Sequence, residues 1–388
     1  MPLLLKTPAD EFLASYALSP DDIAPLEVAL SRLEGAVAKE VTLTPVGVER
    51  IRRYVDSHLT RLSLLTADRN RHPEIASVQV ASPIVITGAP RSGTTFLHSL
   101  MAQDPQHRAP LAWELEFPSP PPESDRLFDD PRVAQWERLQ SGPNATHTHN
   151  LRDSDARKKH LIGALLPEEC GRMLGTMLRN PTGPWSLARV TDFYDWVVNS
   201  QMREAYRVHK KWLQHLQWKS PRDSWLLKYP QHILALDHLT AAYPDVRIIQ
   251  THRTPEETVS SLASLIQTLR AGAFTREDPN ALGQEMLNLQ ANSMQRSREY
   301  RALPGAKAII DVSYRELLHD PMATVAKVYD RLQINLSVSA ESKMNSFLLE
   351  NPQGKLGVHR HNLEEYGLTQ SEVRDRMRFY LDSFAEFL

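Results

Sequence analysis

A short apolar stretch that ends in a glycine-rich turn constrains this chain more than any other feature. Pro83-Ile-Val-Ile-Thr-Gly88 is a β-branched run closed by glycine, which is typical of a buried parallel strand. Gly88-Ala-Pro-Arg-Ser-Gly-Thr-Thr95 follows with the G-x-x-x-x-G spacing of a phosphate loop, and 94–103 has a helical pattern. Such a turn points backbone N–H groups at an oxyanion. The alternative is a tight strand–helix turn without a ligand.

Three more apolar runs of this kind follow, at 224–228, 246–251 and 308–312, and helical patterns at 231–243 and 255–269 lie between them. Strands that alternate with helices form right-handed βαβ units and a parallel sheet. The sequence therefore predicts an α/β fold of the P-loop type, with three layers and helices on both faces of the sheet. Ligands of such sheets bind beyond the carboxyl ends of the strands.

Helical patterns also precede and interrupt the predicted sheet. Apolar residues at helical spacing predict a helical N-terminal region at 1–75, followed by a main domain at 76–388. No strand pattern appears within about 113–222, so this stretch is predicted to be a helical insertion. All seven tryptophans lie between Trp113 and Trp225. They either pack a core or line an apolar acceptor pocket.

Composition narrows the function classes. Lys+Arg 45 against Asp+Glu 47 leaves a net charge of −2, so no basic field favours nucleic acid as a partner. The single cysteine, Cys170, excludes an intramolecular disulfide and a cysteine-rich zinc site, and a cytoplasmic location is expected. No signal peptide or membrane-spanning helix is expected. Peripheral contact with a membrane and the oligomeric state stay open.

The glycine loop lacks the lysine of nucleoside triphosphatases. Thr94 follows the second glycine, where those enzymes place the lysine that holds the β- and γ-phosphates. Arg91 supplies a cation inside the loop instead. We interpret the loop as an oxyanion cradle that is not built for a nucleoside triphosphate with Mg²⁺. A P-loop kinase or NTPase is the alternative enzyme class, and a nucleotide-binding relative without turnover is the other alternative.

A second candidate anion site follows the run at 246–251. Thr254 and Glu257 match a capping box and a proline follows Thr254, so a helix is predicted to begin here. Arg253 stands just before this helix, and Ser261 lies about two turns into it, so together they could hold one phosphate. Alone, Arg253 would more often be a solvated charge. Together with the glycine loop, the pair indicates a ligand with two anionic ends.

On these residues the chain resembles the sulfotransferases that use 3′-phosphoadenylyl sulfate (PAPS), especially the bacterial branch with a Pro-Arg-Ser-Gly-Thr-Thr loop. The resemblance runs from about 83 to 368. The motifs that carry it are Pro90-Arg-Ser-Gly-Thr-Thr95, Ala109-Pro-Leu-Ala-Trp-Glu114, Pro167-Glu-Glu-Cys170, Leu227-Lys-Tyr-Pro230, Thr251-His-Arg253 with Ser261, Asp320-Pro321, and His361 with Tyr366-Gly-Leu368.

The resemblance implies PAPS as donor, adenosine 3′,5′-bisphosphate as product, and no metal. It makes 76–388 the sulfotransferase domain, and the helical insertion its acceptor-binding part. The implied cofactor-binding residues are Arg91, Ser92, Gly93, Thr94 and Thr95 on the 5′-phosphosulfate, Phe96 on the adenine, Arg253 and Ser261 on the 3′-phosphate, and Lys355 and Arg360 in a closing loop. Phe96 is equally explained as a core residue. For Lys355 and Arg360, a solvated loop is the favoured alternative.

Sulfuryl transfer needs fixed cations and a base. Arg91 is the predicted cation on the phosphosulfate. In relatives a lysine at the place of Lys228 contacts the transferred group; a surface lysine is the alternative. Glu114 is the first candidate for the base that takes the hydroxyl proton, and His232 is the second. Glu114 could instead be a salt-bridged carboxylate, and His232 an ordinary residue of a first helical turn.

Other polar residues carry less weight at this stage. Glu168 and Glu169 fit a family pattern, but their role does not follow from the sequence, and His98 is expected to pack or to be solvated. A metal site is not predicted for the group formed by His147, His149, Asp153 and Asp155. The predicted acceptor is a small hydroxylated molecule, apolar or lipid-like, because of the tryptophan-bearing insertion.

Overall fold

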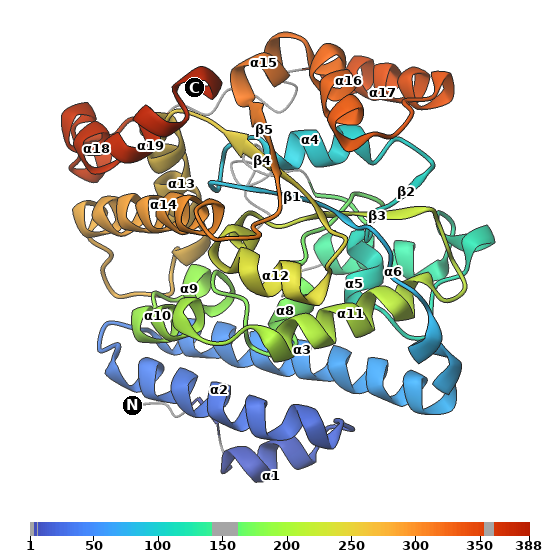
Figure 1. The fold of residues 1–388 in the computed structure, drawn as a ribbon. Helices are drawn as coiled ribbons and strands as arrows, with labels where there is room; N and C mark the ends of the chain where they lie inside the picture. Colours follow the sequence, from blue (N-terminus) through green and yellow to red (C-terminus); the bar gives the residue numbers. More distant parts are fainter. Residues whose placement is uncertain (1–3, 6, 142–161, 353–360) are drawn as a thin grey trace.

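The computed structural model describes residues 4–5, 7–141, 162–352 and 361–388, and a five-stranded parallel sheet lies at its centre (Figure 1). The strand order is β2-β3-β1-β4-β5. The strands are β1 (Ile84–Gly88), β2 (His107–Arg108), β3 (Ser224–Lys228), β4 (Arg247–His252) and β5 (Ile309–Ser313). The predicted α/β fold is confirmed. Because β1 is central, the loop that follows it lies between the ends of β3 and β4.

Successive residues of β1 divide the core into two halves. Ile84 and Ile86 belong to one hydrophobic cluster, whereas Val85 belongs to the other. Side chains of a strand alternate between the two faces of a sheet, so the sheet is covered on both sides. All five residues of β1 are buried. This burial explains why the strand has a continuous apolar sequence rather than an alternating one.

Helices that follow β1 in the chain cover both faces of the sheet. Figure 1 draws α4 and α15–α17 above the sheet and α12–α14 on the other side or beside it. Their bounds are α4 (Thr94–Met101), α12 (Leu236–Ala242), α13 (Pro255–Arg270), α14 (Pro279–Arg301), α15 (Tyr314–His319), α16 (Pro321–Leu332), α17 (Val338–Glu350), α18 (Gln370–Arg376) and α19 (Arg378–Ser383). Short 3₁₀ turns η4 (Glu364–Tyr366) and η5 (Ala385–Phe387) follow α17 and α19.

Two details differ from the sequence predictions. The single helix predicted over 231–243 is a 3₁₀ helix, η3 (Pro230–Ala235), followed by α12. Strand β2 was not predicted, because two residues are too short for any periodic pattern. It pairs with β3 through His107 and Ser224 and extends the sheet by one edge strand.

The N-terminal helices pack into the same core as the rest of the chain. They are α1 (Ala9–Ala14), α2 (Pro20–Lys39) and α3 (Pro45–Arg71), and the turn η1 (Pro73–Ser77) follows. Figure 1 draws them at the bottom of the view. Leu30 of α2 and Leu59 of α3 are fully buried in the cluster that also contains Trp185 and Trp212. Helices are therefore present where the apolar spacing predicts them, and the domain boundary near residue 75 stays a prediction.

The described part of the insertion is helical. Its elements are α5 (Ala112–Glu116), η2 (Ser124–Arg126), α6 (Pro131–Ser141), α8 (Gly171–Gly175), α9 (Gly183–Leu187), α10 (Thr191–Asn199) and α11 (Arg203–Gln217). Five tryptophans are buried, namely Trp113, Trp136, Trp185, Trp212 and Trp225. Within the described residues, no helix is both long and apolar enough to cross a membrane.

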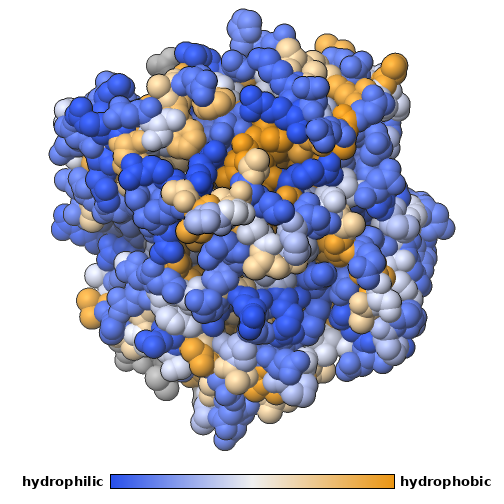
Figure 2. All heavy atoms as spheres, viewed as in Figure 1, coloured by the Kyte–Doolittle hydropathy of each residue, from blue (hydrophilic) through white to orange (hydrophobic). Residues whose placement is uncertain are grey.

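The face shown in Figure 2 is mostly hydrophilic, and apolar atoms gather over the part of the view where Figure 1 draws β5 and α4. β5 is an edge strand, and its residues Ile309 and Ile310 are only half-buried.

Candidate active site

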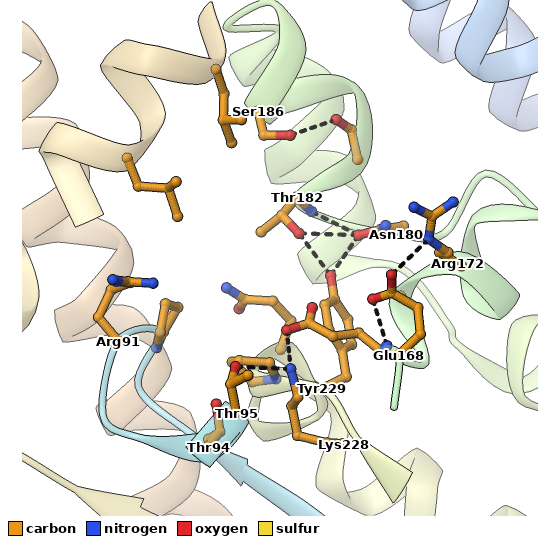
Figure 3. Close-up of a pocket in the computed structure, with 18 of the residues that line it drawn as sticks. Arg91, Thr94, Thr95, Glu168, Arg172, Asn180, Thr182, Ser186, Lys228 and Tyr229 are labelled. Carbon is orange, nitrogen blue, oxygen red and sulfur yellow. Dashed lines mark hydrogen bonds and ion pairs between the residues drawn. The ribbon is translucent and has the colours of Figure 1, made fainter. Parts of the chain in front are cut away.

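A cavity of about 450 Å³ lies at the carboxyl ends of β1, β3 and β4. Residues from all three strand ends contribute to its polar part, including Arg91, Lys228 and Arg253. In Figure 3, Arg91 and Lys228 reach toward the same space from opposite sides, and Thr182 faces them from the insertion. Parallel strands bring their carboxyl ends to one edge, so the sheet topology assembles residues that are far apart in the sequence.

The glycine loop adopts the tight conformation that its sequence predicts. Gly93 has φ 94°, and a Cβ there would lie 2.4 Å from Tyr314 Cδ2. Arg91 also has a positive φ of 73°. The Ser92 hydroxyl donates to Ala89 O at 2.6 Å and is within 2.6 Å of Thr251 Oγ1. Ser92 is fully buried and fastens the loop to β4, so its side chain is not presented to the cavity.

The two predicted anion sites meet. The Nε–H of Arg91 donates to Ser261 Oγ at 3.1 Å, and Nη1–H of Arg253 donates to the main-chain oxygen of Arg91 at 3.2 Å. Arg253 also lies over the Tyr314 ring, 4.3 Å from its centroid. Burial and the neighbouring Arg253 charge lower the pKa of Arg91 from its usual value. Two cations held this close favour an anion between them.

One local detail of the second site was predicted wrongly. Helix α13 begins at Pro255 as expected, but Thr254 forms no capping hydrogen bond to the backbone. Its hydroxyl donates instead to the carboxylate of Glu257, which also accepts from Arg253 Nη2 at 3.2 Å. The guanidinium competes for the carboxylate that the capping box would use, because a charge-assisted bond is stronger than a neutral one.

Lys228 is a buried residue of the cavity rather than a surface lysine. Its side chain is 2 % exposed, its Nζ donates to Thr95 Oγ1 at 3.2 Å, and it forms an ion pair with Glu169. The Glu169 side chain is 27 % exposed and lines the cavity. Lys228 thus links the phosphate loop to a carboxylate that faces the same space.

A chain of ion pairs holds this carboxylate in place. Glu168 accepts from the Glu169 main-chain N–H at 2.8 Å and pairs with Arg172 at 3.3 Å. Arg172 and Arg61 both pair with Glu116, at 3.2 Å and 2.6 Å. Figure 3 shows Glu168 next to Arg172, on the insertion side of the cavity. The network runs from α3 to the cavity, and it fixes the segment that carries Glu169.

The model of a family described as the sulfotransferase family matches residues 83–337, about two thirds of the chain. The chain belongs to the sulfotransferase family. Its activity is the transfer of a sulfuryl group from a donor, and the family resemblance read from the loop motif is confirmed.

Individual relatives agree with this assignment. The sulfotransferase is 20% identical over 309 residues, 78% of its own length and 76% of the relative's, to omega-hydroxy-beta-dihydromenaquinone-9 sulfotransferase Stf3 of Mycobacterium bovis and Mycobacterium tuberculosis. Among solved structures, sulfotransferase STF9 from Mycobacterium avium gives a TM-score of 0.82 at 25% identity, covering 97% of this chain and 94% of that chain. Sulfotransferase STF1 from M. tuberculosis H37Rv gives 0.81 at 29% identity, covering 95% and 97%.

The structure places Glu114 of the sulfotransferase outside the cavity. It is fully buried and pairs with Arg108, whose Nη1 and Nη2 donate to its two oxygens at 3.0 Å and 2.5 Å. The main-chain N–H of Leu111 donates to Oε2 at 2.8 Å. Both oxygens accept hydrogen bonds within the buried core, which fits the salt-bridged alternative better than the predicted base.

His232 also lies away from the cavity. It is 1 % exposed, and its Nδ1 lies 2.8 Å from the hydroxyl of Tyr206. Burial lowers its pKa well below the usual value, which keeps the imidazole neutral. Because His232 does not line the cavity described above, a proton of an acceptor held there is out of its direct reach.

The remaining predicted residues divide into two groups. Thr94, Thr95 and Phe96 line the cavity, and Phe96 also packs against the core cluster on the α4 side of the sheet. Lys355 and Arg360 lie outside the described residues, as does the group formed by His147, His149, Asp153 and Asp155.

Two contributions to the cavity were missed. Glu169 had no assigned role, because its partner Lys228 is 59 positions away and only the folded sheet brings them together. Tyr54 and His58 of α3 also line the cavity, so the N-terminal helices contribute to its wall. Gly175 and Gly183 allow this close approach: a Cβ on them would lie 2.6 Å from His58 Nε2 and 2.3 Å from Tyr54 Oη. Gly175 and Gly183, on either side of the segment 180–182, were the feature of the sequence that could have indicated this close approach of α3.

Proposed function

We propose that this sulfotransferase moves the sulfuryl group of PAPS to the hydroxyl of a small apolar or lipid-like acceptor and releases adenosine 3′,5′-bisphosphate. One observation carries the proposal. Arg91 of the glycine loop and Arg253 line a single cavity, and Arg91 contacts both Arg253 and Ser261. A nucleotide with phosphates at its 3′ and 5′ positions matches two neighbouring anion sites of this kind. The single buried cysteine is in keeping with a cytoplasmic setting.

In the proposed complex, the 5′-phosphosulfate lies against the loop N–H groups and the N-terminus of α4, and Arg91, Thr94 and Thr95 surround it. The 3′-phosphate lies at Arg253 and Ser261. Phe96, which lines the cavity, is available to the adenine ring. The loop that carries Lys355 and Arg360 is kept as a proposed closing segment.

We assign the base to Glu169 instead of Glu114 or His232. Oε1 of Glu169 binds Lys228, and within the described residues no hydrogen bond or ion pair engages Oε2. In the proposed step the acceptor oxygen attacks sulfur, and its proton passes to Oε2 of Glu169. The bond between sulfur and the bridging oxygen breaks, and Lys228 and Arg91 stabilise the charge on the departing phosphate. The step uses no metal.

The apolar part of the cavity supports an apolar acceptor. Beyond the polar end, its wall consists mainly of hydrophobic side chains, including Trp136, Trp185, Leu187, Leu262, Leu265 and Ile266. Burying a long apolar chain there is favourable by about 25 cal/mol per Å². The curated relative named above acts, by its name, on a hydroxylated dihydromenaquinone, which is an acceptor of this class.

Donor binding tests the proposal directly. Calorimetric titration with adenosine 3′,5′-bisphosphate should show binding without Mg²⁺, whereas ATP with Mg²⁺ should bind far more weakly. Arg253→Ala should weaken bisphosphate binding by about 10–100-fold, since a charged hydrogen bond contributes about 1.5–3 kcal/mol. Arg378→Ala, on the exposed face of α19, is the matched control and should leave affinity unchanged. Preference for ATP with Mg²⁺ would support the kinase or NTPase alternative instead.

A further inference from the structure

Three potential metal ligands meet in the protein core behind the reaction centre. Cys170 precedes α8, His209 lies on α11, and His232 lies on η3, and none of the three is more than 1 % exposed. The Cys170 Sγ and one ring nitrogen from each histidine lie within 4.8 Å of one another. None of the three residues lines the cavity described above. The cluster is therefore separate from the proposed substrate site.

Both histidines have a buried nitrogen without a partner. Nε2 of His209 and Nε2 of His232 form no hydrogen bond with any residue that the structure describes, although both residues are buried. Leaving such a group unsatisfied usually costs about 1–3 kcal/mol, so two such nitrogens on rings that cluster with a thiol call for an explanation. A ligand that accepts electron pairs from all three atoms would supply it.

Each histidine is held from its other side by a tyrosine. The Tyr243 hydroxyl lies 2.7 Å from Nδ1 of His209, and the Tyr206 hydroxyl lies 2.8 Å from Nδ1 of His232. Metal-binding histidines commonly use one ring nitrogen for the ion and hold the other in an outer-shell hydrogen bond. The tyrosines hold both rings at Nδ1, which leaves Nε2 of each ring as the nitrogen available to an ion, and the two rings stand at 88° to each other.

We propose that Cys170, His209 and His232 form a three-coordinate site for copper(I). A thiolate and two imidazoles are soft to intermediate ligands that suit copper(I) and zinc(II). Charge separates these ions: copper(I) with one thiolate and two neutral imidazoles is neutral overall. Zinc(II) would leave one positive charge in a buried site and would require a fourth ligand.

Protonation in the core is compatible with this ligand set. Each histidine would bind the ion as a neutral imidazole that donates an electron pair from the nitrogen not held by its tyrosine. Cys170 would bind the ion as a thiolate, so its thiol proton is released when the ion binds. Binding of one copper(I) therefore releases one proton, and the metal and nitrogens keep their oxidation states.

To bind one ion together, the three ligand atoms must move slightly closer to one another. Bond lengths near 2.3 Å to sulfur and 2.0 Å to nitrogen put the ligand atoms about 3.5–3.7 Å apart, roughly 1 Å closer than the present upper limit. Cys170 N–H donates to the main-chain oxygen of Lys228 at 3.0 Å, and Cys170 follows Glu169 directly. A bound ion would therefore tie the segment of Glu169 and Cys170 to α11 and to η3, which follows Lys228 in the chain, in a positioning role.

The test titrates metal-free, full-length protein with copper(I) and, separately, with zinc(II), without oxygen and against a chromophoric chelator of each ion. Cys170 is the only cysteine, so a thiolate-to-metal absorption band and loss of thiol reactivity after denaturation both report on this one residue. The expected result is about one copper(I) per chain with loss of thiol reactivity, and sulfur plus nitrogen neighbours in X-ray absorption.

The variants His209→Gln and His232→Gln keep the cysteine and should each weaken copper(I) binding by at least about 10-fold. His238→Gln, on the surface-facing part of α12, is the matched control and should bind like the unaltered protein. If a histidine variant fails to fold, the absorption spectrum of the unaltered protein still decides the case. The proposal is overturned by tighter binding of zinc(II) than of copper(I), by copper(I) binding that survives both histidine changes, or by no binding.

Discussion

Two carboxylate–cation pairs lie near the ends of adjacent strands, and they differ in what surrounds them. Glu114 pairs with Arg108 of β2, is fully buried and has hydrogen-bond donors on both oxygens. Glu169 pairs with Lys228 of β3, is 27 % exposed on its side chain and lines the cavity. Both are glutamates of sequence motifs that resemble those of the family, at 109–114 and 167–170. Exposure and unsatisfied oxygens, rather than residue type, distinguish a group available for proton transfer from one that holds the fold.

Arg108 shows why the first pair is structural. Besides Glu114, it donates to the main-chain oxygens of Ser220 and Leu216, at 3.2 Å and 3.1 Å. The guanidinium thereby connects β2, the start of α5 and the end of α11. Its counterpart Lys228 donates to one loop hydroxyl and one carboxylate and faces the cavity. The groups of the first pair are buried and bonded to each other and to the backbone. In the second pair, Oε2 of Glu169 remains available to a ligand in the cavity.

The largest effect on folding is expected at the first pair. Glu114→Gln leaves the Arg108 charge buried without a counter-charge, so the free energy of unfolding should fall by about 3–5 kcal/mol. Urea denaturation followed by circular dichroism measures this change. A loss of activity without a loss of stability would instead return Glu114 to the list of catalytic candidates.

The second pair should show the opposite pattern. Lys228→Met should lower kcat by about 10²–10³-fold, because a fixed donor to developing charge is removed. Single-turnover transfer of radiolabelled sulfur into a lipid extract measures it, and the melting temperature shows whether the fold survives. A variant with normal turnover would mean that Lys228 only supports the loop.

A smaller effect concerns how His98, which lies near Lys228, makes the stability of the fold depend on pH. Burial, and then the Lys228 charge, lowers the pKa of His98 to about 3, whereas the unfolded chain has the ordinary value. The unfolded state therefore binds more protons between these values. Stability is full above about pH 6.5 and falls below it, with His98 contributing up to about 1.4 kcal/mol per pH unit.

His98→Gln should therefore flatten the dependence of the unfolding free energy on pH between about 5 and 7. The absolute stability at pH 7 serves as the reference for each protein, because glutamine also alters the contact with Leu226 O. An unchanged slope would show that His98 titrates normally in the folded state.

The parts of the site that could be predicted are local in sequence. The glycine loop and its helix, and Arg253 with Ser261, are short motifs whose geometry follows from neighbouring residues. Their mutual contact required the strand order, which no pattern in the sequence specifies. The same reason explains the missed Glu169–Lys228 pair and the unforeseen partner of Glu114, Arg108, which lies on the unpredicted two-residue strand β2.

The comparison of the two carboxylates is tested most directly by one measurement on Glu169→Gln. Its rate of sulfuryl transfer in a single turnover, at saturating donor, should fall by about 10²–10⁴-fold, since the proton acceptor is lost. Adenosine 3′,5′-bisphosphate should still bind, and the melting temperature should stay close to that of the unaltered protein. A Glu169→Gln enzyme that transfers the sulfuryl group at the normal rate would contradict the account.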